Sequence, residues 1–120
     1  MAGGDPKTMK RIEAIVRPSK LQAVLEALHQ SGDIAVTVID AMGFGRQAGH
    51  SEVYRGVEHE RGLVPKRMVI LYVSDEQVEP IVKLICETGQ TGRFGDGKVA
   101  VLPVENFIRV RTGEEGEVAL

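Results

Sequence analysis

MKRIEAIVRPSKLQAVLEALHQSGDIAVTVIDAM, residues 9–42, has the pattern of a strand, a helix and a second strand. Apolar and polar side chains alternate over residues 9–17, as in a half-buried strand. Apolar residues then recur at helical spacing, and Ser19 and Gln22 stand at the spacing of a capping box at the helix start. Residues 34–42 alternate again. This stretch therefore predicts a β–α–β unit.

Residues 66–104 repeat that order. A nearly continuous apolar strand (KRMVILYV) covers 66–73, a helix follows the capping-box pair Ser74 and Gln77, and a last strand covers 99–104. Two such halves predict an α+β fold of the ferredoxin-like βαββαβ type, an antiparallel sheet with both helices on one face.

The other face of that sheet has no helix to cover it. Ile15 and Ile39 fall on this face and are too apolar to be left in water. We therefore expect this face to be buried against other subunits.

Composition fits one small globular domain. The chain has 120 residues, is 42% hydrophobic and 27% charged, and carries a net charge of -2, which gives no basic footprint for nucleic acid. The single cysteine, Cys86, excludes an internal disulfide and a cysteine-cluster metal site. No apolar run approaches the roughly 20 residues that span a bilayer. We expect a flexible extension at 1–8, a folded domain at 9–120 and a cytoplasmic location.

Between the two halves the pattern breaks down. Residues 43–63 read GFGRQAGHSEVYRGVEHERGL, with many charges and little apolar periodicity. A structureless segment of this length is unusual inside so small a domain and commonly has a function. We interpret it as a long functional loop.

A second glycine-rich segment, TGRFGDGK at 91–98, contains the elements of an anion cradle. Its glycines allow backbone N–H groups to approach phosphate oxygens, and Arg93 and Lys98 add positive charge. It is not a P-loop, because the GxxxxGK[ST] spacing is absent and a strand follows rather than a helix. A connection that is simply rich in glycine explains the octapeptide equally well.

Arg109 and Arg111 alternate, so their side chains point the same way in an extended segment. A polyphosphate between them offsets their repulsion, and so do nearby carboxylates such as Glu105 or Glu114.

The chain lacks the signature of an enzyme. His50 and His59 lie in the long loop without metal-ligand spacing, and no GxSxG or HExxH motif occurs. Cys86 stands beside the apolar stripe of the second helix, as a packed thiol does. We expect no catalytic role.

Four separated motifs, in this order, resemble the PII nitrogen-regulatory family: GFGRQAGHSEVYRG at 43–56, Pro65-Lys66, TGRFGDGK at 91–98 and IRVRTGE at 108–114. The resemblance extends from Met9 to the C-terminus. It implies a homotrimeric signal-transduction protein with the sheets lining the centre and with ATP or ADP bound in three clefts between subunits.

The family's loop names follow from the resemblance. The T-loop spans about 45–63, the B-loop about 91–98 and the C-loop about 109–120. The B-loop would hold the phosphates, and the C-loop arginines would reach the nucleotide across the interface. The implied nucleotide-binding residues are Ile15, Thr37, Gly43, Arg46, Gln47, Thr91, Gly95, Asp96, Gly97, Lys98, Arg109 and Arg111.

The resemblance also implies an effector and partners. 2-Oxoglutarate would chelate the Mg²⁺ of MgATP, with Gln47 contacting the metal and Lys66 pairing with a carboxylate. The T-loop would dock on an ammonium transporter or a nitrogen-assimilation enzyme through Tyr54, Arg55 and Glu58, so that the protein meets the membrane only through a transporter.

Some positions depart from the family pattern. His59 stands where the family's uridylylated Tyr is found, and Val57 where some relatives carry a phosphorylated Ser, so we expect neither modification. Ala48 replaces a loop lysine. Ile70 replaces a Glu near the adenine, and Ala100 an aromatic after the B-loop.

These departures leave a second interpretation open: a diverged PII-like sensor of AMP, ADP or another small metabolite that controls a different transporter or enzyme. Two further classes stand behind it. One is a ferredoxin-like trimer of the divalent-metal tolerance kind, and the other is a slow ATPase that uses the same phosphate cradle.

Overall fold

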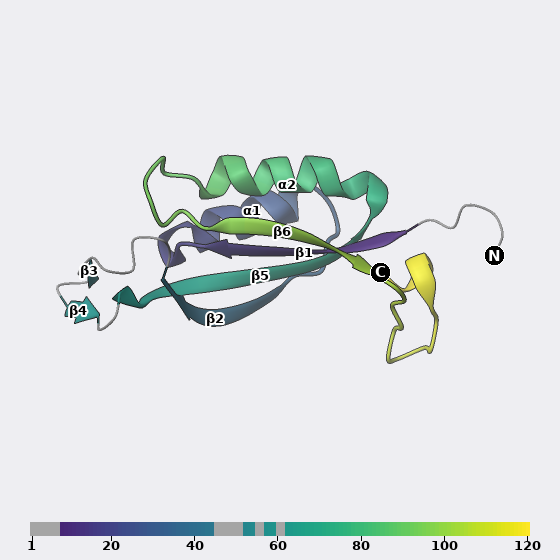
Figure 1. Cartoon of the computed structure of the whole chain (residues 1–120). Coiled ribbons are helices and arrows are strands. Elements are labelled where there is room, and N and C mark those ends of the chain that lie inside the picture. The colour runs from purple at the N-terminus through teal and green to yellow at the C-terminus, as the bar shows by residue number, and fades with distance from the viewer. Residues whose placement is uncertain (1–7, 45–51, 55–56, 60–61) are drawn as a thin grey trace.

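A four-stranded antiparallel sheet with two helices on one face forms the body of the chain (Figure 1). The computed structural model describes residues 8–44, 52–54, 57–59 and 62–120; for 52–54 and 57–59 it describes the backbone only. The elements in chain order are β1 (Met9–Val16), η1 (Pro18–Lys20), α1 (Leu21–Gln30), β2 (Thr37–Gly43), β3 (Glu52–Tyr54), β4 (Val57–His59), β5 (Val64–Ser74), α2 (Asp75–Gly89), β6 (Lys98–Val104) and η3 (Gly116–Ala119).

The strand order in the sheet is β2-β5-β1-β6, and every neighbouring pair is antiparallel. The central strands β1 and β5 are adjacent, with Ile12 opposite Leu71 and Ala14 opposite Val69. This is the predicted ferredoxin-like βαββαβ fold. The alternation of β1 is confirmed, because Ile12, Ala14 and Val16 are buried.

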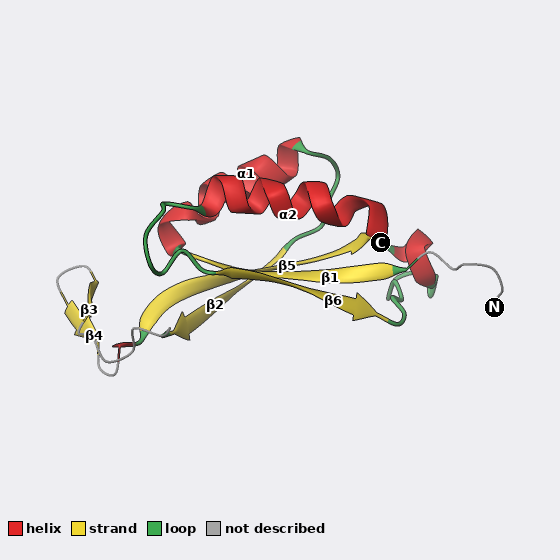
Figure 2. Cartoon of the chain, turned by 45° about the horizontal axis from the view of Figure 1, so that its top comes forward, coloured by secondary structure: helices red, strands yellow, loops and turns green. Residues whose placement is uncertain are grey.

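The core lies between the sheet and the two helices (Figure 2). Apolar side chains from β1, β5, α1 and α2 fill it, and burial of such side chains is the main force that holds sheet and helices together. The buried members of this cluster are Ile12, Ala14, Val16, Val24, Leu28, Val69, Leu71, Val73, Ile81 and Ile85.

The start of the first helix differs from the prediction. Ser19 does not cap α1 but lies inside the 3₁₀ turn η1, and α1 begins after Lys20 without a side-chain cap. Pro18 is the reason, because its fixed φ suits the first position of a helical turn, so the turn starts one residue before Ser19. The second strand also starts later than predicted, at Thr37, although Ile34 and Val36 still pack against the core.

The second helix matches its prediction more closely. Ser74 and Gln77 form the expected capping box, with the Ser74 N–H donating to Gln77 Oε1 at 2.9 Å. The helix continues through Pro80 to Gly89. The packed position expected for Cys86 is wrong, because this residue is exposed.

The sheet face opposite the helices is open in the single chain, as the sequence predicts (Figure 2). Ile39 on this face is 46% exposed, and Leu102 of the edge strand β6 is also exposed. Arg11 and Tyr72 share the face, and the guanidinium donates to the Tyr72 hydroxyl at 3.0 Å.

The segment predicted to be structureless contains a short two-stranded sheet, in which β3 pairs antiparallel with β4. The strand-forming residues Val53, Tyr54 and Val57 account for it. The rest of 45–61 lies outside the described residues, as does the predicted N-terminal extension except Thr8. The backbone carbonyl of Thr8 accepts the Asp75 N–H at 3.2 Å.

Candidate functional site

The B-loop joins α2 to β6 at one end of the sheet (Figure 1). Its last residue, Lys98, is paired with Ile15 near the end of β1. Gly43, at the root of the T-loop, is beside Lys66 of β5, because a Cβ added at Gly43 would lie 4.0 Å from Lys66 Cγ. Sheet topology therefore brings the B-loop, the T-loop root and Lys66 to the same end of the molecule.

Asp96 organises the B-loop from within. Its carboxylate accepts the backbone N–H groups of Thr91 at 2.7 Å and Gly92 at 2.8 Å, together with the Thr91 hydroxyl. The Arg17 Nε donates to the same carboxylate at 2.9 Å. The Thr91 hydroxyl and the Arg17 guanidinium hold the pKa of Asp96 well below its usual range. The carboxylate is thus directed into the loop, where it holds the loop closed.

Two cations hold the carbonyls at the middle of the loop. Arg17 Nη2 donates to the carbonyl of Phe94 at 2.6 Å, and Lys66 Nζ donates to the carbonyl of Gly95. In a trans peptide the C=O and the next N–H point in opposite directions. The N–H groups of Gly95 and Asp96 therefore face away from the two cations.

Those two N–H groups form the candidate anion site. Neither donates to an acceptor in the described part of the chain. Successive amides that point the same way form a concave nest that binds phosphate oxygens. The local geometry is compatible with a phosphate group, which was one of the two interpretations that the glycine pattern left open.

Gly97 is the tightest position in the loop. Its φ is +103°, and a Cβ built on it would lie 1.7 Å from the backbone oxygen of Ile15. Only glycine allows the loop to approach β1 this closely. Gly92 and Gly95 also have positive φ, at +87° and +95°.

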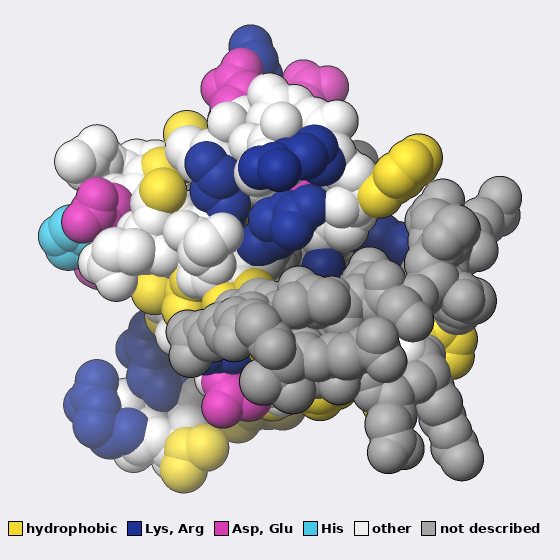
Figure 3. Space-filling view, turned by 90° about the vertical axis from the view of Figure 1, so that its left-hand side faces the viewer, with side chains coloured by type: hydrophobic (Ala, Val, Ile, Leu, Met, Phe, Trp, Pro, Cys, Tyr) yellow, Lys and Arg dark blue, Asp and Glu magenta, His cyan; other side chains and the backbone are white. Residues whose placement is uncertain are grey.

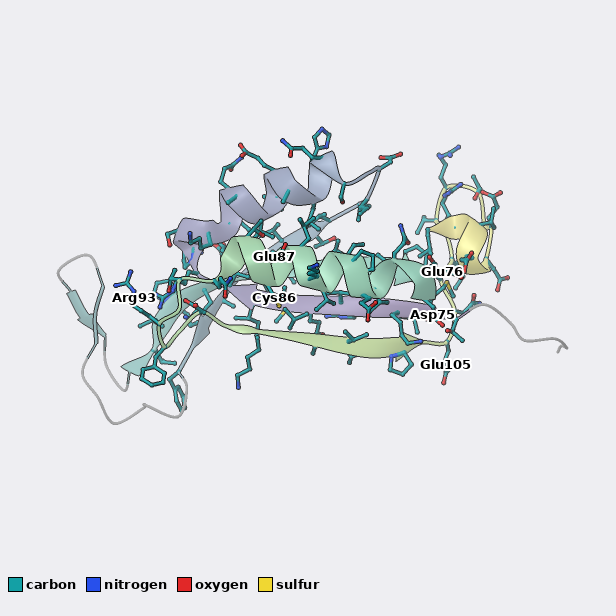
Figure 4. The ribbon with its side chains drawn as sticks, turned by 90° about the horizontal axis from the view of Figure 1, so that it is seen from above. Asp75, Glu76, Cys86, Glu87, Arg93 and Glu105 are labelled. Carbon is teal, nitrogen blue, oxygen red and sulfur yellow. The ribbon has the colours of Figure 1, made fainter. Side chains whose placement is uncertain are left out.

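Basic side chains gather on this end of the molecule (Figure 3). Arg93 projects outward from the loop, whereas Glu105, just after β6, lies at the far end (Figure 4). Arg93, one of the two basic residues of 91–98, is therefore exposed at the B-loop end.

The C-loop lies at the opposite end of the chain's sheet (Figure 1). There Arg109 pairs with Glu114 at 2.7 Å and donates to the carbonyl of Val118 at 3.1 Å. The sequence left Glu105 and Glu114 open as partners of the arginines, and in the structure Glu114 is the partner of Arg109. Arg111 is exposed and makes no ion pair within the described residues.

The predicted site residues thus fall into groups. Most lie at the B-loop end, Thr37 lies further along the sheet opposite Ile70, and the two arginines lie at the far end. Arg46, Gln47 and Arg55 lie outside the described residues. Only the backbone of Tyr54 and Glu58 is described, and no side-chain contact of theirs is assigned.

Arg17 is the residue that sequence reasoning missed. The prediction treated it as an ordinary polar position at the end of β1. Its partner Asp96 is 79 positions away in sequence, so no local pattern connects the two. The available signal was a basic residue at the strand end that the fold places beside the B-loop.

Other kinds of site receive no support from the described residues. Within 8–44 and 62–120, no group of His, Cys, Asp and Glu side chains gathers as a metal site does. The proposed Mg²⁺ ligand, Gln47, lies outside these ranges. No helix in the described part is long and apolar enough to cross a bilayer.

Fold and site together define a small ferredoxin-like domain with a candidate anion site at one end of its sheet. Residues 9–114 match the family model for nitrogen regulatory protein P-II. The chain is 50% identical to the P-II protein of Pasteurella multocida and 48% identical to that of Azospirillum brasilense, each over 93% of this chain and all of the relative. The structure of Arabidopsis thaliana PII bound to citrate superposes with a TM-score of 0.78 at 42% identity, covering 97% of this chain and 94% of that one.

The chain therefore belongs to the PII family of nitrogen regulatory proteins. Members of this family are signal-transduction proteins and not enzymes.

Proposed function

We propose that three copies of the chain form a homotrimer that binds ATP or ADP in the clefts between subunits. In this proposal, 2-oxoglutarate joins MgATP through Gln47 and Lys66, and the T-loop controls an ammonium transporter or a nitrogen-metabolism enzyme. The protein works in the cytoplasm and meets a membrane only through such a transporter.

The main support for this proposal is the distance between the B-loop and the C-loop within one chain. The B-loop and the C-loop lie at opposite ends of β6, from Lys98 to Val104, which at about 3.3 Å per residue is roughly 20 Å of strand. A single nucleotide held by both elements must therefore take them from two different chains. The exposed sheet face and Val110, whose side chain is 99% exposed between the two arginines, offer the apolar surface for that assembly.

Complementation between two defective chains tests the shared site. Lys98→Ala removes a B-loop charge, and Arg109→Ala with Arg111→Ala removes the C-loop charges. Each variant alone should form trimers that bind ATP weakly. Mixed trimers should recover one strong site each, because one interface then joins an intact B-loop to an intact C-loop.

Calorimetry on separated mixed trimers gives the readout. One strong ATP site per mixed trimer supports the two-chain cleft, and no recovery in any mixture contradicts it. In the wild-type protein, 2-oxoglutarate should bind only when MgATP is present, since the carboxylates need the divalent cation to offset the triphosphate charge.

A diverged nucleotide preference is the second candidate, and Ile70 favours it. This residue is buried and apolar, pairs with Thr37 across the strands, and lies in the same cross-strand row as Ala100. In the family pattern a Glu and an aromatic residue stand at positions 70 and 100, so this chain offers the base fewer polar and stacking contacts. Tighter binding of AMP or ADP than of ATP in the same calorimetry would select this candidate.

The T-loop modification is a separate part of the proposal. His59 has no hydroxyl that could form the nucleotidyl ester made on Tyr in uridylylated relatives. We therefore expect no mass increase of a uridylyl group when the protein is incubated with a PII uridylyltransferase and UTP, with a His59→Tyr variant as the matched positive control.

A further inference from the structure

We propose that Arg17 is a positioning residue for nucleotide binding: it clamps the B-loop so that the Gly95 and Asp96 N–H groups face the phosphates, and it does not itself bind them. The inference rests on the proposed function, since it takes the polyphosphate of a nucleotide as the ligand of the B-loop.

The geometry of the guanidinium supports a clamp. The edge formed by Nε and Nη2 binds two acceptors of the loop, the Asp96 carboxylate at 2.9 Å and the Phe94 carbonyl at 2.6 Å. A planar fork of this kind fixes orientation as well as distance. Because that edge is engaged within the subunit, it is not directed at a ligand.

The position of Arg17 explains why the loop needs it. A Cβ added at Gly95 would lie 3.3 Å from Arg17 Nη2 and 3.5 Å from Lys66 Nζ, so the two cations lie directly beneath this residue. Without Arg17, the peptide between Phe94 and Gly95 loses the donor that fixes its direction. The Gly95 N–H is then free to rotate away from the anion.

The Asp96 carboxylate is the other half of the clamp. It joins Arg17 to the N–H groups of Thr91 and Gly92 at the start of the loop. Both side chains are partly buried, at 28% and 22% exposure, and the carboxylate also accepts the Thr91 and Gly92 donors, so the pair is more than an isolated surface contact. The pair thus links the start of the loop to its middle.

The clamp and a direct contact predict opposite results for Asp96→Asn. If Arg17 contacts the phosphates directly, removing the negative charge of Asp96 releases the arginine and strengthens ATP binding. If Arg17 is a clamp, Asp96→Asn loosens the loop and weakens ATP binding, as Arg17→Ala does.

The experiment measures MgATP affinity of the full-length protein by calorimetry in four variants. We expect Arg17→Ala and Asp96→Asn each to weaken binding by roughly tenfold, the scale of hydrogen bonds to charged groups. The double variant should bind about as weakly as either single one, because both break one clamp. Arg17→Lys should resemble Arg17→Ala, since an ammonium cannot reproduce the planar fork.

Lys83→Ala is the matched control for charge. Lys83 is an exposed cation on α2 that makes no ion pair within the described residues, and its removal should change ATP affinity by less than about twofold. Binding that is retained in Arg17→Lys, or strengthened in Asp96→Asn, would overturn the clamp.

A second readout needs no ligand. In the free protein, the ¹H–¹⁵N heteronuclear NOE of the Gly95 amide should fall in Arg17→Ala and stay at the wild-type value in Lys83→Ala. An unchanged NOE contradicts the clamp even when nucleotide binding is not measured. Failure of the wild-type protein to bind any adenine nucleotide would instead overturn the proposed function.

Discussion

The B-loop and the C-loop both present arginine and acidic side chains, yet the structure uses these charges differently. At the B-loop, Asp96 pairs with Arg17, which lies just after β1, and the two side chains fix the direction of backbone amides of the loop. In the C-loop, Glu114 pairs with Arg109, a side chain proposed to bind the ligand itself. In the proposed function, the first ion pair therefore orders the loop that binds the ligand, whereas the second occupies a side chain that binds it.

This difference has a thermodynamic consequence. A ligand gains affinity from a loop that is already ordered, because no ordering cost remains at the moment of binding. A ligand that binds Arg109 must first displace Glu114, so the lost ion pair reduces the binding free energy that the contact with Arg109 provides. We therefore expect substitutions at the B-loop to reduce affinity and the removal of Glu114 to raise it.

The largest effect is expected from Gly97→Ala. The new Cβ meets the Ile15 carbonyl oxygen, and the residue keeps a positive φ that an L side chain tolerates poorly. The positive φ alone costs about 1–2 kcal/mol and the overpacking about 1–3 kcal/mol more. We expect the Tm to fall and MgATP affinity to drop about 100-fold, as measured by thermal unfolding and calorimetry.

Gly92→Ala is the matched control in the same loop. Gly92 also has a positive φ, at +87°, but nothing lies within 4 Å of its added Cβ. Gly92→Ala should therefore lower the free energy of unfolding only through backbone strain, by about 1–2 kcal/mol. Equal losses in the two variants would show that the close approach to β1 does not shape the loop.

Acid should release the B-loop only at very low pH. The folded-state pKa of Asp96 lies below its unfolded value, first through the Thr91 hydroxyl and then through Arg17. The contribution of the Asp96 carboxylate to folding stability is therefore fully present above its unfolded pKa of about 3.9. This contribution is lost as the pH falls through the folded-state pKa.

The Gly92 amide proton reports this change, because it donates to the Asp96 carboxylate. We expect its NMR chemical shift to be steady from pH 7 down to about 4 and to move only below that. In Asp96→Asn the shift should differ from the wild type at neutral pH and show no titration. A titration of the wild-type amide near pH 4 or above would mean that the carboxylate lacks these partners.

The sequence predicted the parts of this molecule that depend on local pattern. Alternation in β1 identified the buried Ile12 and Ala14, and Ser74 with Gln77 identified the start of α2. The glycines of the B-loop were compatible both with an anion cradle and with a plain glycine-rich connection, and the anion cradle stays a prediction. Local pattern failed at Ser19, because Pro18 offered a competing start for the helical turn.

Features that depend on distant pairs were beyond such reasoning. Arg17, just after β1, and Lys66 of β5 are 79 and 29 positions from their partners in the B-loop, and only the folded sheet brings them together. The contact of Gly97 with Ile15 depends on strand register in the same way. The pairing of Arg109 with Glu114 was one of several choices that the sequence left open.

The smallest effect is expected from Glu114→Gln. This change keeps the shape of the side chain but removes the charge that holds Arg109 at 2.7 Å. Exposed ion pairs contribute about 0.2–1 kcal/mol, so freeing Arg109 should raise MgATP affinity by roughly 1.5- to 5-fold.

Glu117→Gln is the control, since Glu117 is a neighbouring exposed carboxylate that forms no ion pair with Arg109. Both variants remove one negative charge from the C-loop, so any general effect on a polyphosphate is common to both. A gain confined to Glu114→Gln, seen by calorimetry at constant salt, identifies the carboxylate as an internal competitor of the ligand. Equal gains would assign the effect to net charge alone, and a loss would mean that Glu114 holds Arg109 in the orientation that binds.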